Sequence, residues 1–303
     1  MTLSYIKYDQ VDRQKWDECI FNSHNALIYG TSAFLDKMAG CWDAVIEGDY
    51  ESVMPLPFRK KFGIRYVYQP AFMQQGGIFS REQLQEDKIE AFLKEAFRHF
   101  MFAEFTLNYS NKVPSNFRSV LRANYIIPPD DDLRFGIITQ EQKFYRELDI
   151  STNAGLSYVS SADIGGAVKL YGELYSKRLP YFKPEDFQGF SELCVSQQEN
   201  VIVRNVMKGT KLHAQCLLFR YKDRLYNLVN NVTPAGRESS ANYFLFNELV
   251  KEFAANGLTL DLEGSDVQGI AFFYKKLGSI EQPYPFVRHN GLPWPLNLLK
   301  RVW

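Results

Sequence analysis

The chain has 303 residues, about twice the usual domain size of roughly 100 to 150 residues, so we expect two domains or two lobes. Apolar residues make up 46% and charged residues 23%, which is typical of folded globular proteins and excludes a disordered chain. The 35 basic and 35 acidic side chains cancel, so no overall field draws the protein to nucleic acid or anionic lipid. The sequence has neither a signal-peptide core nor an apolar run of roughly 18 residues, and we expect a cytoplasmic protein without a membrane span.

The first half of the chain reads as three strands, a helix and a fourth strand. Alternating apolar residues predict a hairpin of strands 42–47 and 51–58, followed after a short turn by a strand at 64–70. Apolar residues at helical spacing predict a helix over 86–100, and the aromatic, alternating stretch 102–109 predicts the fourth strand.

The same order recurs in the second half. Strands are predicted at 201–207, 211–221 and 224–232, then a helix over 240–256 and a strand at 258–264. A repeat of one order at a spacing of about 155 residues indicates an internal duplication of topology. The predicted fold class is α/β (α+β), with two tandem lobes that each contain a mixed, mostly antiparallel sheet flanked by helices.

A turn-forming acidic stretch, Pro128-Pro-Asp-Asp-Asp132, separates the two sets of elements. We therefore expect one lobe at 1–138 and a second at 139–303. The four His and four Cys residues have no metal-ligand spacing, so we assign no metal site.

One stretch near the end resembles a known family. Ala271-Phe-Phe-Tyr-Lys-Lys-Leu-Gly278 is similar to the segment that ends the core of GNAT acetyltransferases, where a short helix delivers a Tyr to the acyl-thioester site. With the preceding Leu260-Asp-Leu-Glu-Gly264, it is more similar still to the Fem-type transferases. Those are two-lobed, GNAT-like proteins that place amino acids from aminoacyl-tRNA on peptidoglycan peptides. The sequence departs from the common GNAT pattern at Ser279, where a Phe is usual.

The resemblance implies an acyltransferase whose chemistry lies in the C-terminal lobe, with Tyr274 as the acid for the leaving group. A Tyr on a short amphipathic helix is otherwise a packing residue. Asp261 and Glu263 alternate on one predicted strand, so both are expected on one face, Glu263 as base and Asp261 as orienting group. An acidic strand end that caps the next helix is an equal alternative.

The acyl donor of a GNAT enzyme carries a pyrophosphate, which needs backbone N–H groups at a helix N-terminus. The segment at that place is Thr233 to Asn242, and a capped loop without a ligand is an equal alternative. The candidate donor-binding residues are Val229, Asn230, Asn231, Gly236, Arg237, Ser239, Ser240 and Asn242.

Three functions remain open from the sequence. The first is an N-acyltransferase that moves an acyl group from acyl-CoA, as acetyl-CoA, to a small-molecule or peptide amine. The second is a Fem-type aminoacyl transferase, against which the zero net charge argues weakly because tRNA is a polyanion. The third is a GNAT-like protein that binds a ligand without catalysis. The first lobe has no matching Tyr motif at 117–125 and is expected to be non-catalytic.

Overall fold

The computed structural model describes residues 2–264 and 268–298. The chain forms two compact units, each with its own sheet and helices. Unit 1 contains the chain up to Arg122 and the stretch from Pro283 onward, and unit 2 contains Ala123 to Gln282.

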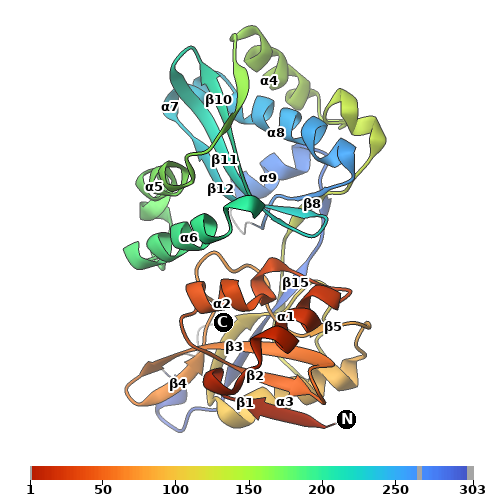
Figure 1. Cartoon of the computed structure of the whole chain (residues 1–303), viewed down its shortest axis with the longest axis vertical. Helices are drawn as coiled ribbons and strands as arrows, with labels where there is room; N and C mark the ends of the chain where they lie inside the picture. The colour runs from red at the N-terminus through yellow and green to blue at the C-terminus, as the bar shows by residue number, and fades with distance from the viewer. Residues whose placement is uncertain (1, 265–267, 299–303) are drawn as a thin grey trace. The chain divides into compact units, whose positions relative to one another are not determined.

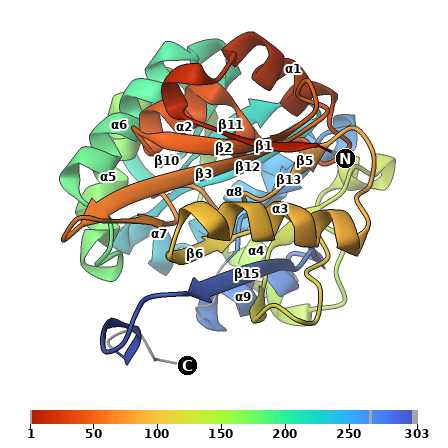
Figure 2. The same ribbon diagram turned by 90° about the horizontal axis from the view of Figure 1, so that it is seen from below.

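Unit 1 is a sheet whose central strands are covered on both faces. Its strands follow the order β1 (Leu3–Ile6), β2 (Trp42–Glu47), β3 (Ser52–Lys61), β4 (Ile64–Val67), β6 (Phe102–Thr106), β15 (Tyr284–Asn290) and β7 (Ser119–Arg122), and β5 (Phe79–Ser80) pairs with β3. Its helices are α1 (Arg13–Asn22), α2 (Ser32–Met38) and α3 (Glu86–His99). Figure 2 shows α1 and α2 on one side of β2 and β3, with α3 on the other.

Helix α3 forms because its apolar residues recur at helical spacing and its ends carry suitable charges. Ile89, Phe92, Leu93 and Ala96 are buried against the sheet residues Val45, Met54 and Leu56 in one core. Acidic residues lie in the first turn and basic residues in the last, where each sign is favoured by the helix dipole.

Unit 2 is a second sheet with helices on both faces. Its strands follow the order β14 (Ile280–Glu281), β8 (Tyr125–Ile127), β13 (Thr259–Asp261), β12 (Arg224–Val232), β11 (Lys211–Tyr221), β10 (Val201–Lys208) and β9 (Ser157–Ser161). Its helices are α4 (Gln142–Asn153), α5 (Ile164–Tyr175), α6 (Pro184–Ser196), α7 (Pro234–Glu238), α8 (Ala241–Glu252) and α9 (Gln268–Lys276). In Figure 1, α5 and α6 cover one face, and α4, α8 and α9 lie on the other.

The two sheets confirm the predicted duplication and fold class. The order β2-β3-β4-α3-β6 in unit 1 matches β10-β11-β12-α8-β13 in unit 2. In each copy the helix connects two parallel strands, β4 to β6 and β12 to β13, while the hairpins before it are antiparallel. Helix α3 and strand β6 of unit 1 therefore correspond to helix α8 and strand β13 of unit 2.

The division between the units differs from the expected one at 138/139. Strand β8 pairs with β13 and β14, so the chain enters unit 2 at Ala123, and strand β15 pairs with β6 and β7, so the chain later returns to unit 1. The acidic turn lies inside unit 2, where the Asp130 N–H donates to the Ala254 carbonyl at 3.3 Å. The stretch expected to match the Tyr274 helix in the first half forms strands β7 and β8 instead.

The return of the chain gives a direct test of this division. A chain truncated after Gln282 loses β15, whose Val287 is fully buried between β6 and β7, and burial of each such side chain contributes about 1.5 to 3 kcal/mol. We expect hydrogen exchange to show at least about 100-fold less protection of β6 while β10 to β12 stay protected. A chain truncated after Asn290 keeps β15 and serves as the control. Undiminished protection of β6 in the shorter chain would contradict the assignment of β15 to unit 1.

Candidate active site

Strands β12 and β13 pair only at the start of β12, and they part where β13 ends. The parallel register joins Arg224 to Thr259, Leu225 to Leu260 and Tyr226 to Asp261, where β13 ends. Strand β12 continues to Val232, and its pairing with β11 shifts by one residue at Leu228. Such a bulge bends a strand and increases its twist, so we expect β12 to bend just beyond the residues that pair with β13.

A buried ion pair holds the strands at this point. The Arg224 Nε lies 2.8 Å from Asp261 Oδ2, the Asp261 side chain is fully buried, and the Arg224 Nη2 donates to Gln282 Oε1 at 2.7 Å. The other Asp261 oxygen accepts the Glu263 N–H at 3.0 Å. Both carboxylate oxygens of Asp261 thus have a partner within unit 2, which makes it a positioning residue.

Glu263 does not share a strand face with Asp261, because β13 ends before it. Its backbone is left-handed, with φ of 66°, a conformation that non-glycine residues seldom adopt. The alternation expected from the sequence therefore fails here. The Glu263 side chain is half-buried, and its charge acts on both Tyr171 and Tyr274.

Tyr274 lies on α9 and is buried between aromatic rings. Its ring centroid is 5.9 Å from that of Tyr125 and 6.2 Å from that of Phe246. Burial raises the pKa of Tyr274 above its ordinary value, and electrostatic interactions with Tyr171, Glu263 and Asp261 raise the pKa further. At neutral pH the side chain is therefore a phenol that can donate a proton.

Tyr171 approaches the same place from α5, on the opposite face of the sheet. Burial raises the pKa of Tyr171 to about 12, with Tyr175 and Glu263 adding to the shift. Tyr171 also contributes to the raised pKa of Tyr274, so the two side chains lie near one another.

Unsatisfied amide groups gather on β12 beyond the parting point. Asn227 is buried, and neither its Nδ2 nor its Oδ1 has a partner at hydrogen-bonding geometry. The amide nevertheless lies close enough to Tyr274 to lower the pKa of Tyr274 slightly. The Oδ1 atoms of Asn230 and Asn231 are also buried without a partner. The Asn231 Nδ2 donates to Ala167 O and Gln215 Oε1, so that side chain also ties α5 to the sheet. Because unsatisfied buried groups are rare and costly, Asn227 is a candidate contact for a substrate.

The expected phosphate loop uses most of its polar groups internally. The Gly236 N–H donates to Thr233 Oγ1 at 3.0 Å, and the Ser239 hydroxyl donates to the Ala235 carbonyl at 3.0 Å. A Cβ on Gly236 would come within 1.9 Å of the His213 carbonyl oxygen, so this glycine permits close packing of α7 on β11. Arg237 is exposed and has no ion-pair partner in the described part of the chain.

An acidic side chain of the protein lies at the start of α8. No side chain caps this helix, and the hydroxyl of Ser240, the residue before it, donates to Glu147 Oε2 at 2.5 Å. Glu147 comes from α4, which packs against α8. A negative charge is favoured at this end of a helix, and here the protein supplies it. Asn242, in the first turn of α8, has a buried Oδ1 without a partner.

No protein-family model and no curated protein matches the sequence. Solved structures do match. FemX has a TM-score of 0.62 at 13% identity, over 99% of this chain and 100% of its own. L-PGS from Bacillus licheniformis has a TM-score of 0.55 at 11% identity, over 95% of each chain. The tandem GNAT protein from the clavulanic acid biosynthesis pathway has a TM-score of 0.52 at 11% identity, over 96% of this chain and 99% of its own. The chain has a tandem GNAT-like fold of the Fem type.

Of the residues that the sequence names as catalytic, Asp261 and Glu263 are joined by a hydrogen bond, and the charges of both act on Tyr274. Four further residues of the candidate site, Asn227, Tyr171, Arg224 and Glu147, were not named from the sequence. Asn227 alone carried a signal, as a polar residue inside the apolar run Leu225-Tyr-Asn-Leu-Val229. Across residues 2–264 and 268–298, no three His, Cys, Asp or Glu side chains gather as metal ligands, and no helix is long and apolar enough to span a membrane.

Proposed function

We propose that this protein transfers an acyl group to an amine at the place where β12 and β13 part. The observation that carries the proposal is the buried, unsatisfied amide of Asn227 beside the protonated hydroxyl of Tyr274. An acyl carbonyl placed there would meet a hydrogen-bond donor and a proton donor, the two groups that acyl transfer requires.

The reaction assigns one task to each side chain. The amine nitrogen attacks the acyl carbon, and the Asn227 Nδ2 donates to the oxygen on which negative charge develops. The bond from the acyl carbon to the leaving group then breaks, and Tyr274 gives its proton to the leaving atom. Glu263, which is half-buried, accepts the proton that the amine loses. Asp261 and Arg224 hold the strand ends in place.

For the donor, the sequence favours acyl-CoA, but we propose an aminoacyl ester instead. Glu147 at the start of α8 would repel a pyrophosphate there. In the Thr233 to Asn242 loop, the Gly236 N–H already donates to Thr233 Oγ1. Arg237 remains as a candidate contact for acyl-CoA, which is the second donor to consider.

The acidity of Tyr274 supports the same preference. A thiol has an ordinary pKa of about 8.5, so a phenol with a raised pKa would protonate a departing thiolate only against an unfavourable equilibrium. A departing ribose alkoxide is a much stronger base and needs that proton. An ester donor therefore makes better use of this Tyr.

Replacing Tyr274 by Phe tests the reaction centre. We expect turnover to fall by about 100- to 10,000-fold, the usual effect of losing a general acid, while the ring continues to pack against Tyr125. Amide product is measured by mass spectrometry with charged tRNA and with acetyl-CoA as donors, and melting temperature is measured on the same sample. Tyr125→Phe, which removes a hydroxyl from the neighbouring ring, should retain turnover within about threefold. An equal loss of turnover in the two variants would show that Tyr274 is not the general acid.

Replacing Glu147 by Gln tests the donor. If Glu147 keeps phosphate from the start of α8, its neutralisation should tighten acetyl-CoA binding by about 5- to 10-fold. Transfer from charged tRNA should stay unchanged. Calorimetry measures the first effect, with Glu141→Gln, an exposed acid at the N-cap of α4, as control. Tight binding of acetyl-CoA by the unaltered protein, with no gain in Glu147→Gln, would contradict the ester donor.

A further inference from the structure

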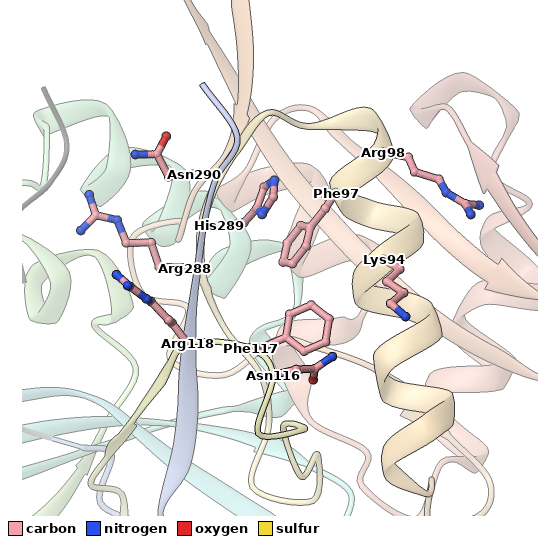
Figure 3. A pocket seen from close by; sticks show the side chains of 9 residues that line it. All are labelled: Lys94, Phe97, Arg98, Asn116, Phe117, Arg118, Arg288, His289 and Asn290. Carbon is pink, nitrogen blue, oxygen red and sulfur yellow. The ribbon is translucent and has the colours of Figure 1, made fainter. Parts of the chain in front are cut away.

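Unit 1 carries an open groove of about 630 Å³, within the range of roughly 300 to 1,000 Å³ that small-ligand sites occupy. It lies between the last turns of α3, the segment before β7 and the end of β15 (Figure 3). The side chains that line it are Lys94, Phe97, Arg98, Asn116, Phe117, Arg118, Arg288, His289 and Asn290. Neither the expected catalytic residues nor the expected donor loop belongs to this unit.

Flat rings form the middle of the groove. The Phe97 and His289 rings are stacked, with centroids 4.1 Å apart and planes 7° from parallel, and the Phe117 ring lies 5.9 Å from Phe97. Burial lowers the pKa of His289, so its imidazole is uncharged at neutral pH and packs face to face on Phe97. Phe97 and Phe117 are half-exposed, as a surface for stacking a further ring requires.

Cationic side chains flank these rings on both sides. Lys94 and Arg98 project from α3, while Arg118 and Arg288 lie on the opposite side (Figure 3). Among the described residues that line the groove, none is acidic. A ligand that lies along the rings would therefore meet positive charge at either end.

The carboxylates that balance some of these cations lie outside the lining. The ion pairs are Lys94 with Glu90 at 2.8 Å, Arg98 with Glu95 at 2.6 Å and Arg288 with Glu104 at 3.2 Å. Arg118 is exposed and has no ion-pair partner in the described part of the chain. Its guanidinium is therefore the side chain best placed to bind an incoming anion bidentately.

We propose that this groove binds a phosphorylated ligand with a flat heterocyclic ring, the chemistry of a mononucleotide. The ring stacks against this aromatic cluster, beside Phe117, and the phosphate pairs with Arg118. Phosphate alone would leave the aromatic surface unused, and a neutral aromatic ligand would leave the cations unused. The site lies in unit 1 and does not depend on the proposed reaction in unit 2.

Calorimetry on the full chain tests the groove with three probes: AMP, adenosine as the ring without phosphate, and inorganic phosphate as the charge without the ring. We expect AMP to bind at least about 10-fold more tightly than either of the others, since only AMP uses both parts of the groove. Arg118→Ala should weaken AMP about 10-fold and leave adenosine unchanged. Phe117→Leu, which keeps an apolar side chain, should weaken both AMP and adenosine.

The controls separate this site from general charge effects and from the reaction centre. Arg81→Ala removes an exposed arginine of unit 1 that does not line the groove, and Tyr274→Phe alters unit 2; both should bind AMP as the unaltered protein does. Equal affinity for AMP and a trinucleotide of adenosine would identify a free nucleotide as the ligand. Tighter binding of the trinucleotide would identify the end of a nucleic-acid strand as the ligand. Absence of AMP binding at millimolar concentration, or AMP binding that Arg118→Ala leaves unchanged, would overturn the proposal.

Discussion

The buried ion pair of Arg224 and Asp261 is the constraint on which the rest of unit 2 depends. A carboxylate that is fully buried is tolerable only when it is paired and hydrogen-bonded, and Asp261 meets this need with Arg224 and the Glu263 N–H. Through Gln282 the same Arg224 also binds the last residue of the unit. The pair thereby fixes the last register at which β12 and β13 run together.

The pairing of β12 with β13 ends at this ion pair, and side chains from both faces of the sheet lie near it. Beyond Tyr226, strand β12 continues without β13, and Asn227 is left with an unsatisfied amide. Tyr274 arrives from α9 on one face and Tyr171 from α5 on the other, and the left-handed turn at Glu263 brings a carboxylate to both. The proposed chemistry thus depends on backbone geometry at the end of a short strand. At the start of α8, Glu147 in turn limits what kind of donor the unit would accept.

The sequence could predict what local patterns encode. The periodicity of α3, the hairpins of both sheets and the amphipathic helix around Tyr274 are all present in single stretches of sequence. It could not predict that β15 returns to unit 1, because a strand pattern does not specify its partner. Glu147 meets Ser240 across 93 residues, and the groove of unit 1 combines α3, the segment before β7 and β15, so neither forms a sequence motif. Alternation misplaced Glu263 because β13 ends before the apolar pattern does.

The most direct test of the account is whether the side-chain amide of Asn227 meets the acyl donor. With asparagine labelled by ¹⁵N, the Asn227 side-chain resonances can be followed by NMR as an aminoacyl ester analogue is added. We expect these resonances to shift on addition of the analogue, because an unsatisfied amide gains an acceptor. The side-chain resonances of Asn205, whose oxygen already accepts from Gln215, should stay in place. A bound analogue that leaves the Asn227 resonances unchanged would contradict a reaction centre at the parting of β12 and β13.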